Sequence, residues 1–447
     1  MIYGRGNPRD FEKFYQATGD PSWRWDNMLK YFKKSEKLRN NEIENSEYAE
    51  FHGTEGNIGV TKEDRTITDV YLKGYEEAGE EVVVDNVGSG IGLGYSKCLY
   101  TILKGQRNDA ANTYLRSLKD NTKLYVTRNS LATKIIFDEN NNAVGVEFVK
   151  KGKTITVKAN KEVIITAGPV KSPQILMLSG VGPKEELETH KINVLSDLPV
   201  GKNLQCVIGA FLDFKTNRKT DPPPFDEHRL PAPIILGYSA LNKCSMYPDY
   251  ETQNFIIDDY YYFLSLCAFT LKLKNSICDR LFSAADNKQM LVTILLNINP
   301  KSRGTVSLYS SNPNDQPRIA YGYYNDEADL NATVKYIQQY LKLKDTPYFQ
   351  SLGLEFLEAT ADCAQLEFGS YEYWRCYALC LVALTGRTTG TCAMGSVVDG
   401  QLRVLGVQKL RVVGASVMPN SLGGAIFAPE VALAEKAAEI IVADGKE

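Results

Sequence analysis

Hydrophobic and polar residues follow a helical period near the start of the chain. Residues 7–36 predict two short helices on either side of a Gly-Asp-Pro turn, with Asp26 as the cap of the second. Residues 67–79 predict an amphipathic helix that ends at Gly79, because glycine readily takes the left-handed conformation that closes a helix. We interpret these segments as structural, because they contain no obvious catalytic or ligand-binding motif.

The pattern changes after residue 123 to four strand-like runs, with a polar Asp-Glu-Asn-Asn-Asn turn between the second and the third. Such runs are typical of short strands that follow one another in a small sheet. They are Leu124–Thr127, Ala132–Phe137, Ala143–Lys150 and Thr154–Lys158.

A strand followed by a helix comes next. Residues 162–168, EVIITAG, are almost wholly apolar, which is typical of a parallel strand buried on both faces. In the helix that follows, Ser172 and Pro173 suit the N-cap and first positions and Gly180 suits the exit. The N-terminus of this helix lies just past the carboxyl end of a strand, where anions are favoured.

The rest of the chain divides into two further parts. Residues 207–384 contain a Pro-rich loop and long alternating runs typical of antiparallel strands, and we interpret them as a second domain. Residues 385–447 contain two short strands and a helix with Pro429 at its first position and Glu430 in its first turn.

Composition narrows the possible partners. The net charge is -3, from 51 basic and 54 acidic residues, and no basic block occurs, so nucleic acid is not expected as a partner. Apolar runs are shorter than the roughly 18–20 residues of a transmembrane helix. The longest, residues 260–271, is more typical of a buried helix or a cap over a pocket than of membrane contact.

Cysteine and glycine patterns give no metal or nucleotide motif. The nine cysteines form no CxxC pair and no Cys/His spacing of a zinc site, so no metal is expected. Cys376 and Cys380 are one helical turn apart, which favours two small side chains on one face over a bridge. Four glycines in residues 88–94 do not satisfy GxGxxG, and a loop is the simpler interpretation.

Several ordered motifs carry a resemblance to a known family. They are MIYGRGNPRDFEKF, FHGTEGNIGV, GPVKSPQILMLSGVGP, DLPVGKNLQ, SRGTVSL, GTCAMG and RVVGASVMP. In this order they resemble the glucose-methanol-choline (GMC) oxidoreductases, most of all the insect members that are glucose dehydrogenase-like or ecdysone oxidase-like. The likeness runs over nearly the whole chain.

The resemblance implies an α/β fold. A Rossmann-type, doubly wound FAD-binding domain comes first, here residues 1–206, and residues 385–447 return to it. Residues 207–384 would form an α+β substrate domain with an antiparallel sheet. The flavin-binding positions that the resemblance implies are Val126, Ala167, Gly168, Ser172, Pro173, Gly414, Ala415, Ala425, Ala428 and Pro429.

The activity implied is oxidation of a small-molecule alcohol, in which a hydride leaves the alcohol carbon for FAD while a histidine takes the hydroxyl proton. A second histidine or an asparagine steadies the substrate oxygen. Sugars, steroids and aliphatic alcohols all remain open as substrates, because residues 207–384 are where the likeness is weakest. The oligomeric state also remains open.

The start of the chain departs from the family. GMC oxidoreductases open with a strand, GxGxxG and a helix, then a Gly-Gly-Ser-Ser run that holds the pyrophosphate. This sequence begins at Met1, inside or just past that run, so we expect it to lack the first βαβ segment. Either the natural protein is longer, with a signal peptide that would make it secreted, or the product is incomplete. The resemblance thus implies FAD but not its retention by this chain.

The two catalytic positions depart as well. Arg387 stands where the family has its catalytic histidine, and arginine cannot accept a proton at ordinary pH. Phe427 stands at the second catalytic position, and a phenyl ring neither donates nor accepts. Gly414 replaces the usual aspartate and Ala425 the usual asparagine. We therefore expect an inactive or impaired oxidoreductase, or alternatively a non-catalytic binding or structural protein of the same fold.

Two further hypotheses concern cations and histidines. Arg387 could attract a carboxylate or phosphate ligand, or simply pair with a nearby acid. His52 is expected to pack in the core, and His228 in the Pro-rich loop is a weak candidate for a pocket residue. None of the three histidines, the third being His190, lies near a catalytic stretch in sequence.

We expect the chain to purify colourless, because the phosphate cradle of the family's first strand and glycine-rich turn is not in this sequence. An absorption spectrum of the purified protein tests this. A yellow preparation with near-ultraviolet and blue flavin bands would contradict it.

Overall fold

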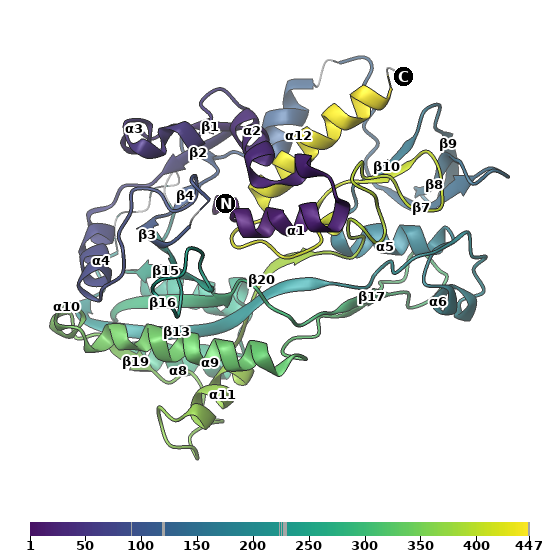
Figure 1. Cartoon of the computed structure of the whole chain (residues 1–447). Helices are drawn as coiled ribbons and strands as arrows, with labels where there is room; N and C mark the ends of the chain where they lie inside the picture. Colours follow the sequence, from purple (N-terminus) through teal and green to yellow (C-terminus); the bar gives the residue numbers. More distant parts are fainter. Residues whose placement is uncertain (91, 119–120, 223, 225, 227–229, 446–447) are drawn as a thin grey trace.

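The computed structural model describes residues 1–90, 92–118, 121–222, 224, 226 and 230–445 (Figure 1). A long antiparallel sheet runs through the lower half of the molecule in this view. Helices α1, α2 and α12 lie above it, and α8, α9 and α11 lie below it, with both chain termini on the upper side. His228, residues 223, 225, 227 and 229 of the Pro-rich loop around it, and Ile91 of the glycine-rich segment fall outside the described residues.

The N-terminal helices match the predicted positions. Helix α1 spans Pro8–Thr18; Asn7 and Asp10 cap it reciprocally, and Gly19 closes it with a φ of 70°. Helix α2 spans Trp25–Ser35, but Asp26 is not its cap: it lies in the first turn, where its charge still favours the helix N-terminus. The other elements of this region are α3 (Asn41–Glu44), α4 (Thr66–Glu77), β1 (Glu36–Leu38), β2 (Ile58–Lys62), β4 (Leu99–Tyr100), β5 (Ile102–Leu103) and β6 (Gln106–Arg107).

A buried network of four charged side chains fixes this region. The Arg5 guanidinium donates to Glu36 at 2.6 Å, and the His52 ring approaches Glu36 through Nδ1 at 3.0 Å and Asp85 through Nε2 at 3.0 Å. Both ring nitrogens face carboxylates, so both carry a proton when they donate. His52 is therefore buried as predicted, as a charged member of the network.

Opposite charges overcome the effect of burial on these groups. Burial by itself would raise the pKa values of Glu36 and Asp85, but Arg5 and His52 hold them below the usual carboxyl range. Burial and Arg5 would lower the pKa of His52, yet its hydrogen bonds to Asp85 and Glu36 raise it above the ordinary value.

Three of the four predicted strands form a small antiparallel sheet. Strands β7 (Ser130–Phe137), β8 (Ala143–Lys150) and β9 (Lys153–Lys158) pair in that order. The prediction for Leu124–Thr127 is wrong, because this segment has no strand partner among the described residues and Tyr125 is 92% exposed.

The predicted parallel strand and helix are both present, with corrected details. Strand β10 (Val163–Ile165) pairs in parallel with β21 (Leu410–Val412), but Ile164 is 41% exposed, so burial on both faces is wrong. In the described part of the chain this sheet has two strands, and Ile164 of β10 points to a face that solvent reaches. Helix α5 spans Gly168–Leu178 and begins before Ser172 and Pro173, which therefore lie inside it and do not cap it.

The large sheet has seven strands in the order β19-β13-β16-β15-β14-β3, with β20 also paired to β13. The strand pairings in it are antiparallel, as predicted for residues 207–384. The fifteen-residue strand β13 pairs with β16, β19 and β20. The strands are β3 (Gly94–Lys97), β13 (Gln205–Lys219), β14 (Ile234–Ser239), β15 (Tyr250–Ile257), β16 (Lys288–Asn297), β19 (Glu355–Leu357) and β20 (Val382–Thr389).

Helices cover the lower face of this sheet (Figure 1). Residues 260–271 form α7 (Tyr260–Ser265) and the π-helical turn η5 (Leu266–Thr270), and no helix in the described part of the chain is long and apolar enough to cross a membrane. Disulfides join Cys267 to Cys278 and Cys363 to Cys376, so Cys376 is bridged, though not to Cys380. The remaining helices and strands are α6 (Lys184–Thr189), α8 (Asn275–Ala285), α9 (Glu327–Leu341), α10 (Pro347–Ser351), α11 (Tyr371–Cys380), α12 (Phe427–Asp444), β11 (Val181–Gly182), β12 (Ser196–Asp197), β17 (Thr305–Ser307) and β18 (Arg318–Ala320).

We predict that Glu36→Gln lowers the free energy of unfolding by about 3–5 kcal/mol, because it leaves the buried Arg5 and His52 without their shared carboxylate. Urea denaturation measures this, with Glu188→Gln, at the exposed ion pair with Lys184, as the matched control.

The wild type should also lose stability at both ends of the pH scale. The lowered pKa values of Glu36 and Asp85 make their contribution complete above the ordinary carboxyl range and lost as the pH falls through the folded-state values. The contribution of His52 is complete below its ordinary pKa and lost as the pH rises through its raised value. A Glu36→Gln protein as stable as wild type would show that the network is not needed.

Candidate functional site

Arg387 lies in an irregular part of strand β20. Between two regular ladder positions, residues 385–387 of β20 lie opposite Val207 of β13 alone, which forms a bulge. Gly386 takes a φ of +67° at this point, a conformation that side chains other than glycine rarely adopt. Bulges of this kind re-aim a side chain, and here the one that is turned into the interior is Arg387.

The Arg387 side chain forms a two-pronged ion pair with Glu251 of β15. Nη1 donates to Oε2 at 2.6 Å and Nη2 to Oε1 at 2.8 Å, while the Gln253 amide donates to Oε1 at 2.7 Å. The Glu251 side chain is fully buried and that of Arg387 is 7% exposed. The interpretation that Arg387 pairs with a nearby acid is confirmed, which removes the basis for a free cation that attracts an anionic ligand.

The surroundings of Arg387 keep its guanidinium charged and keep the neighbouring Cys98 and Tyr238 side chains neutral. Burial alone would lower the pKa of Arg387, but the charge of Glu251 and its hydrogen bonds raise it above the usual value. Burial raises the pKa of Cys98 to about 12 and that of Tyr238 far above its usual range. Neither the Cys98 thiol nor the Tyr238 phenol is therefore ionised near neutral pH, and neither can serve as a base there.

Hydrogen bonds tie the turn after Arg387 to two of the predicted cofactor-binding elements. The Thr391 hydroxyl donates to the Pro169 carbonyl of α5 at 2.7 Å. The Gly390 amide donates to the Ala415 carbonyl at 3.2 Å, at the start of the 3₁₀ turn η7 (Ala415–Val417). The structure thus brings the Arg387 turn, the N-terminus of α5 and η7 together.

The backbone around α5 and η7 is open enough for a cofactor. Gly168 and Gly414 have φ values of +76° and +122°, and a Cβ atom at either would meet nothing within 4 Å. Ala167 is exposed, and the buried Ser172 hydroxyl has no hydrogen-bond partner within the described structure. These positions fit a flavin nucleotide, which would approach the exposed N-terminus of α5.

The start of α12 completes this side of the site. The Glu430 carboxylate accepts the Ala415 N–H at 3.2 Å, which ties the first turn of α12 to η7. Ala428 and Pro429 are buried in the same turn. Ala425 packs on Gly4 so closely that a Cβ atom on Gly4 would lie 2.7 Å from its nitrogen.

Phe427 and Val126 each line a groove that Arg387 does not line. Phe427 is half-buried and lines a groove of about 530 Å³ between α12 and the π-helical turn η3 (Ala111–Leu115), in which Tyr114 donates to Glu435 at 2.6 Å. Val126 is 59% exposed and lines a second groove on η3 with Leu115. Among the predicted flavin-binding positions, Val126 is thus not in the group formed by α5, η7 and α12.

Sequence reasoning missed Glu251, Gln253 and Tyr238. The one signal that could have found Glu251 is a charged residue inside a strand-like run, because a charge buried in a sheet needs a partner. Of the histidines, His52 belongs to the Arg5 network and His190 ends α6, while His228 is outside the described residues.

Known proteins similar to this chain share both its sequence and its fold. Residues 1–207 and 300–434 match the family models described as GMC oxidoreductase. The ecdysone oxidase of Bombyx mori is 33% identical over 461 residues, which cover 99% of this chain and 68% of that protein. The glucose dehydrogenase [FAD, quinone] of Drosophila melanogaster is 30% identical over 463 residues, covering 99% and 72%.

Solved structures agree on the fold. A formate oxidase of Aspergillus oryzae aligns with a TM-score of 0.84 and 22% identity, covering 100% of this chain and 82% of that one. Pyridoxine 4-oxidase aligns with a TM-score of 0.80 and 22% identity, covering 98% and 81%. The predicted fold class, an α/β flavin-binding domain with an antiparallel-sheet substrate domain, is confirmed.

We predict that Glu251→Ala lowers the free energy of unfolding by about 3–5 kcal/mol, because an unpaired guanidinium stays buried. Arg387→Met with Glu251→Leu should recover most of that loss, since no buried charge is left over. Urea denaturation of Glu251→Leu, Arg387→Met and the double variant that combines them measures the coupling.

The matched control is Glu12→Ala, which removes an exposed carboxylate paired with Arg24 and should change stability by less than about 1 kcal/mol. Additive effects of the Arg387 and Glu251 substitutions would show that the two charges are not coupled.

Proposed function

This chain belongs to the GMC oxidoreductase family, and from that premise we propose that it is a flavin-dependent oxidoreductase of CH–OH donors whose turnover is lost or strongly impaired. The observation that carries the proposal is the buried Arg387–Glu251 ion pair at the family's histidine position. The resemblance seen in the motifs is confirmed by relatives at 30–33% identity over nearly the whole chain.

The proposed substrate class is a small-molecule alcohol. The similar proteins named above are an ecdysone oxidase and a glucose dehydrogenase, which supports an alcohol group on a steroid or a sugar. An aliphatic alcohol is also consistent with the family. The sheet that would face such a substrate contributes β15 and β20, the two strands joined by the Arg387–Glu251 pair.

Bound FAD would supply the hydride acceptor for such a reaction. Its flavin side would be held by the N-terminus of α5, by η7 at Gly414 and Ala415, and by the first turn of α12 at Ala428 and Pro429. The open backbone at Gly168 and Gly414 supports this placement. The proposal concerns how FAD would be held when it is supplied, and it does not include retention of FAD through purification.

The missing step is removal of the hydroxyl proton. Arg387 cannot accept it, because its guanidinium stays protonated and its pKa is raised further by Glu251. Glu251 is a carboxylate, but both of its oxygens accept from Arg387, one accepts from Gln253 as well, and none of its side chain reaches solvent. A proton acceptor must lie within hydrogen-bond reach of the substrate, and the buried Glu251 carboxylate is occupied by Arg387 and Gln253.

The second histidine or asparagine, which would hold the substrate oxygen, is missing as well. Phe427 faces the groove beside Tyr114 and offers no hydrogen bond to a substrate oxygen. Loss of one general base typically lowers a rate by about 10²–10⁴. Loss of the residue that holds the substrate oxygen adds to this, so the expected activity is far below that of a complete site.

A non-catalytic protein of the same fold is the second candidate. Arg387, Phe427, Gly414 and Ala425 together favour it, since each replaces a residue type that the family uses at the flavin or the substrate. Such a protein would bind an alcohol ligand without turning it over. Alcohol-dependent turnover by the unaltered chain at a rate normal for the family would exclude this candidate.

We predict that Arg387→His with Phe427→Asn restores alcohol-dependent dye reduction by at least about 100-fold over the unaltered, FAD-supplemented protein. The imidazole supplies the proton acceptor, and Glu251 is placed to orient it. Flavin absorbance and denaturation curves establish equal cofactor content and folding in each sample.

The matched control is Arg387→Lys with Phe427→Asn, which keeps a cation beside Glu251 but offers no neutral base. It should remain as inactive as the starting protein. An unaltered protein as fast as the His/Asn variant would overturn the proposal.

A further inference from the structure

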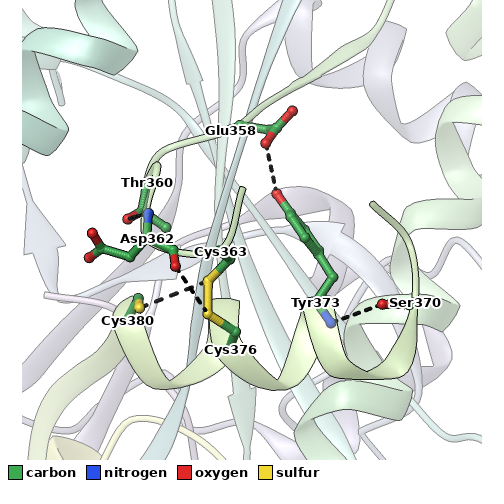
Figure 2. The surroundings of a disulfide bond; sticks show 8 residues. All are labelled: Glu358, Thr360, Asp362, Cys363, Ser370, Tyr373, Cys376 and Cys380. Atoms are coloured by element: carbon green, nitrogen blue, oxygen red, sulfur yellow. Dashed lines mark hydrogen bonds between the residues drawn. A yellow bond between two sulfur atoms is a disulfide. The ribbon is translucent and has the colours of Figure 1, made fainter. Parts of the chain in front are cut away.

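Three cysteines lie together on the lower side of the molecule, away from the Arg387 cluster. Figure 2 shows the disulfide between Cys363 and Cys376, with the Cys380 sulfur pointing toward it. The Cys380 Sγ lies 4.0 Å from the Cys363 Sγ, and all three sulfur atoms lie within 4.8 Å of one another. The Cys380 thiol is thus a neighbour of an existing disulfide.

Helix geometry explains the arrangement. Cys376 and Cys380 are four residues apart on α11, so their side chains lie one above the other on the same face. Both point toward Cys363, which lies in the loop before the helix (Figure 2). Cys363 therefore has two candidate partners on consecutive turns of one helix.

We propose that Cys363, Cys376 and Cys380 form an intramolecular thiol–disulfide exchange site. The Cys380 thiolate attacks the Cys363 sulfur, and the Cys363–Cys380 bond forms as the Cys363–Cys376 bond breaks. Cys376 leaves as a thiolate and takes up a proton, while the proton of Cys380 goes to water. One disulfide and one thiol are present before and after, so the step needs no oxidant or reductant.

Exposure sets the roles of the three sulfurs. Cys380 is exposed, Cys363 is fully buried, and Cys376 is half-buried. The residue that solvent reaches is thus the attacking thiol, and the shared sulfur is protected from outside reagents. Exchange inside the cluster is favoured over attack on Cys363 by a small thiol from solution.

Burial of the Cys380 sulfur and two nearby charges determine the pH at which the exchange runs. Burial of its sulfur raises the pKa of Cys380, Asp362 raises it further, and Lys274, just before α8, opposes them. Only the thiolate attacks, so the rate should rise about tenfold for each pH unit below that pKa. The exchange is slow at neutral pH and fast in mildly alkaline solution.

The exchange also shifts the point at which α11 is cross-linked to Cys363 toward β20, the strand that carries Arg387. Helix α11 ends at Cys380, and β20, which carries Arg387, begins at Val382. With Cys376 bridged, the cross-link holds the middle of α11. With Cys380 bridged, it holds the last residue of the helix, next to β20.

Disulfide mapping of the intact protein tests the proposal. Samples held at pH 7 and pH 9 are quenched with acid, alkylated and digested with trypsin and chymotrypsin without reduction. Cleavage after Arg375 and Tyr377 separates Cys376 from Cys380, so mass spectrometry distinguishes the two disulfides. We expect both in the wild type, with the Cys363–Cys380 form appearing about 100-fold faster at pH 9 than at pH 7.

Three variants sharpen the result. Cys376→Ser, oxidised with glutathione disulfide, should form the Cys363–Cys380 bond, and Cys380→Ser should hold only Cys363–Cys376. Cys244→Ser removes another exposed free cysteine and should leave the exchange unchanged.

The proposal fails if wild type yields only Cys363–Cys376 at both pH values. It also fails if a folded Cys376→Ser protein leaves Cys363 and Cys380 both alkylated. The wild-type measurement decides the matter even if Cys376→Ser does not fold.

Discussion

A guanidinium and a carboxylate buried together impose the main constraint on this molecule. Removing either charge from water is costly, and the two-pronged Arg387–Glu251 pair offsets that cost only while both partners stay in place. The pair joins β20 to β15 across the interior of the large sheet. The turn that follows Arg387 then holds the N-terminus of α5 and η7 in position through Thr391 and Gly390. The positions of α5 and η7 therefore depend on a charge pair inside the large sheet.

The same pair explains how an arginine is tolerated at a buried position of the large sheet. An arginine placed there without Glu251 would leave a buried cation unpaired, so the structure needs both residues at once. Together they produce a rigid, neutral unit that neither accepts a proton nor attracts an anion. The fold therefore accommodates an arginine inside the large sheet as long as Glu251 is present to pair with it.

Local sequence patterns predicted strands correctly where neighbouring segments of the chain pair with one another. They failed where the structure of a segment depends on residues far away in the sequence. The alternation in β7, β8 and β9 was enough, because these strands pair with one another. Leu124–Thr127 has the same composition but no neighbouring strand in the described structure, and its side chains face solvent. The identity of Arg387 was visible in the sequence, whereas Glu251 was not, because 136 positions separate the two residues. Partners that far apart are set by the register of β15 and β20, which no local period records.

The length of β13 has a consequence for how the molecule opens. Its fifteen residues pair with β16 on one side and with β19 and β20 on the other, so its backbone is protected along both edges. Amide hydrogens held in this way exchange with solvent only when the surrounding strands separate as a cooperative unit. β13 is therefore the segment whose deuterium uptake reports global unfolding, while the short β10–β21 pair, in which Ile164 is 41% exposed, reports local fluctuations.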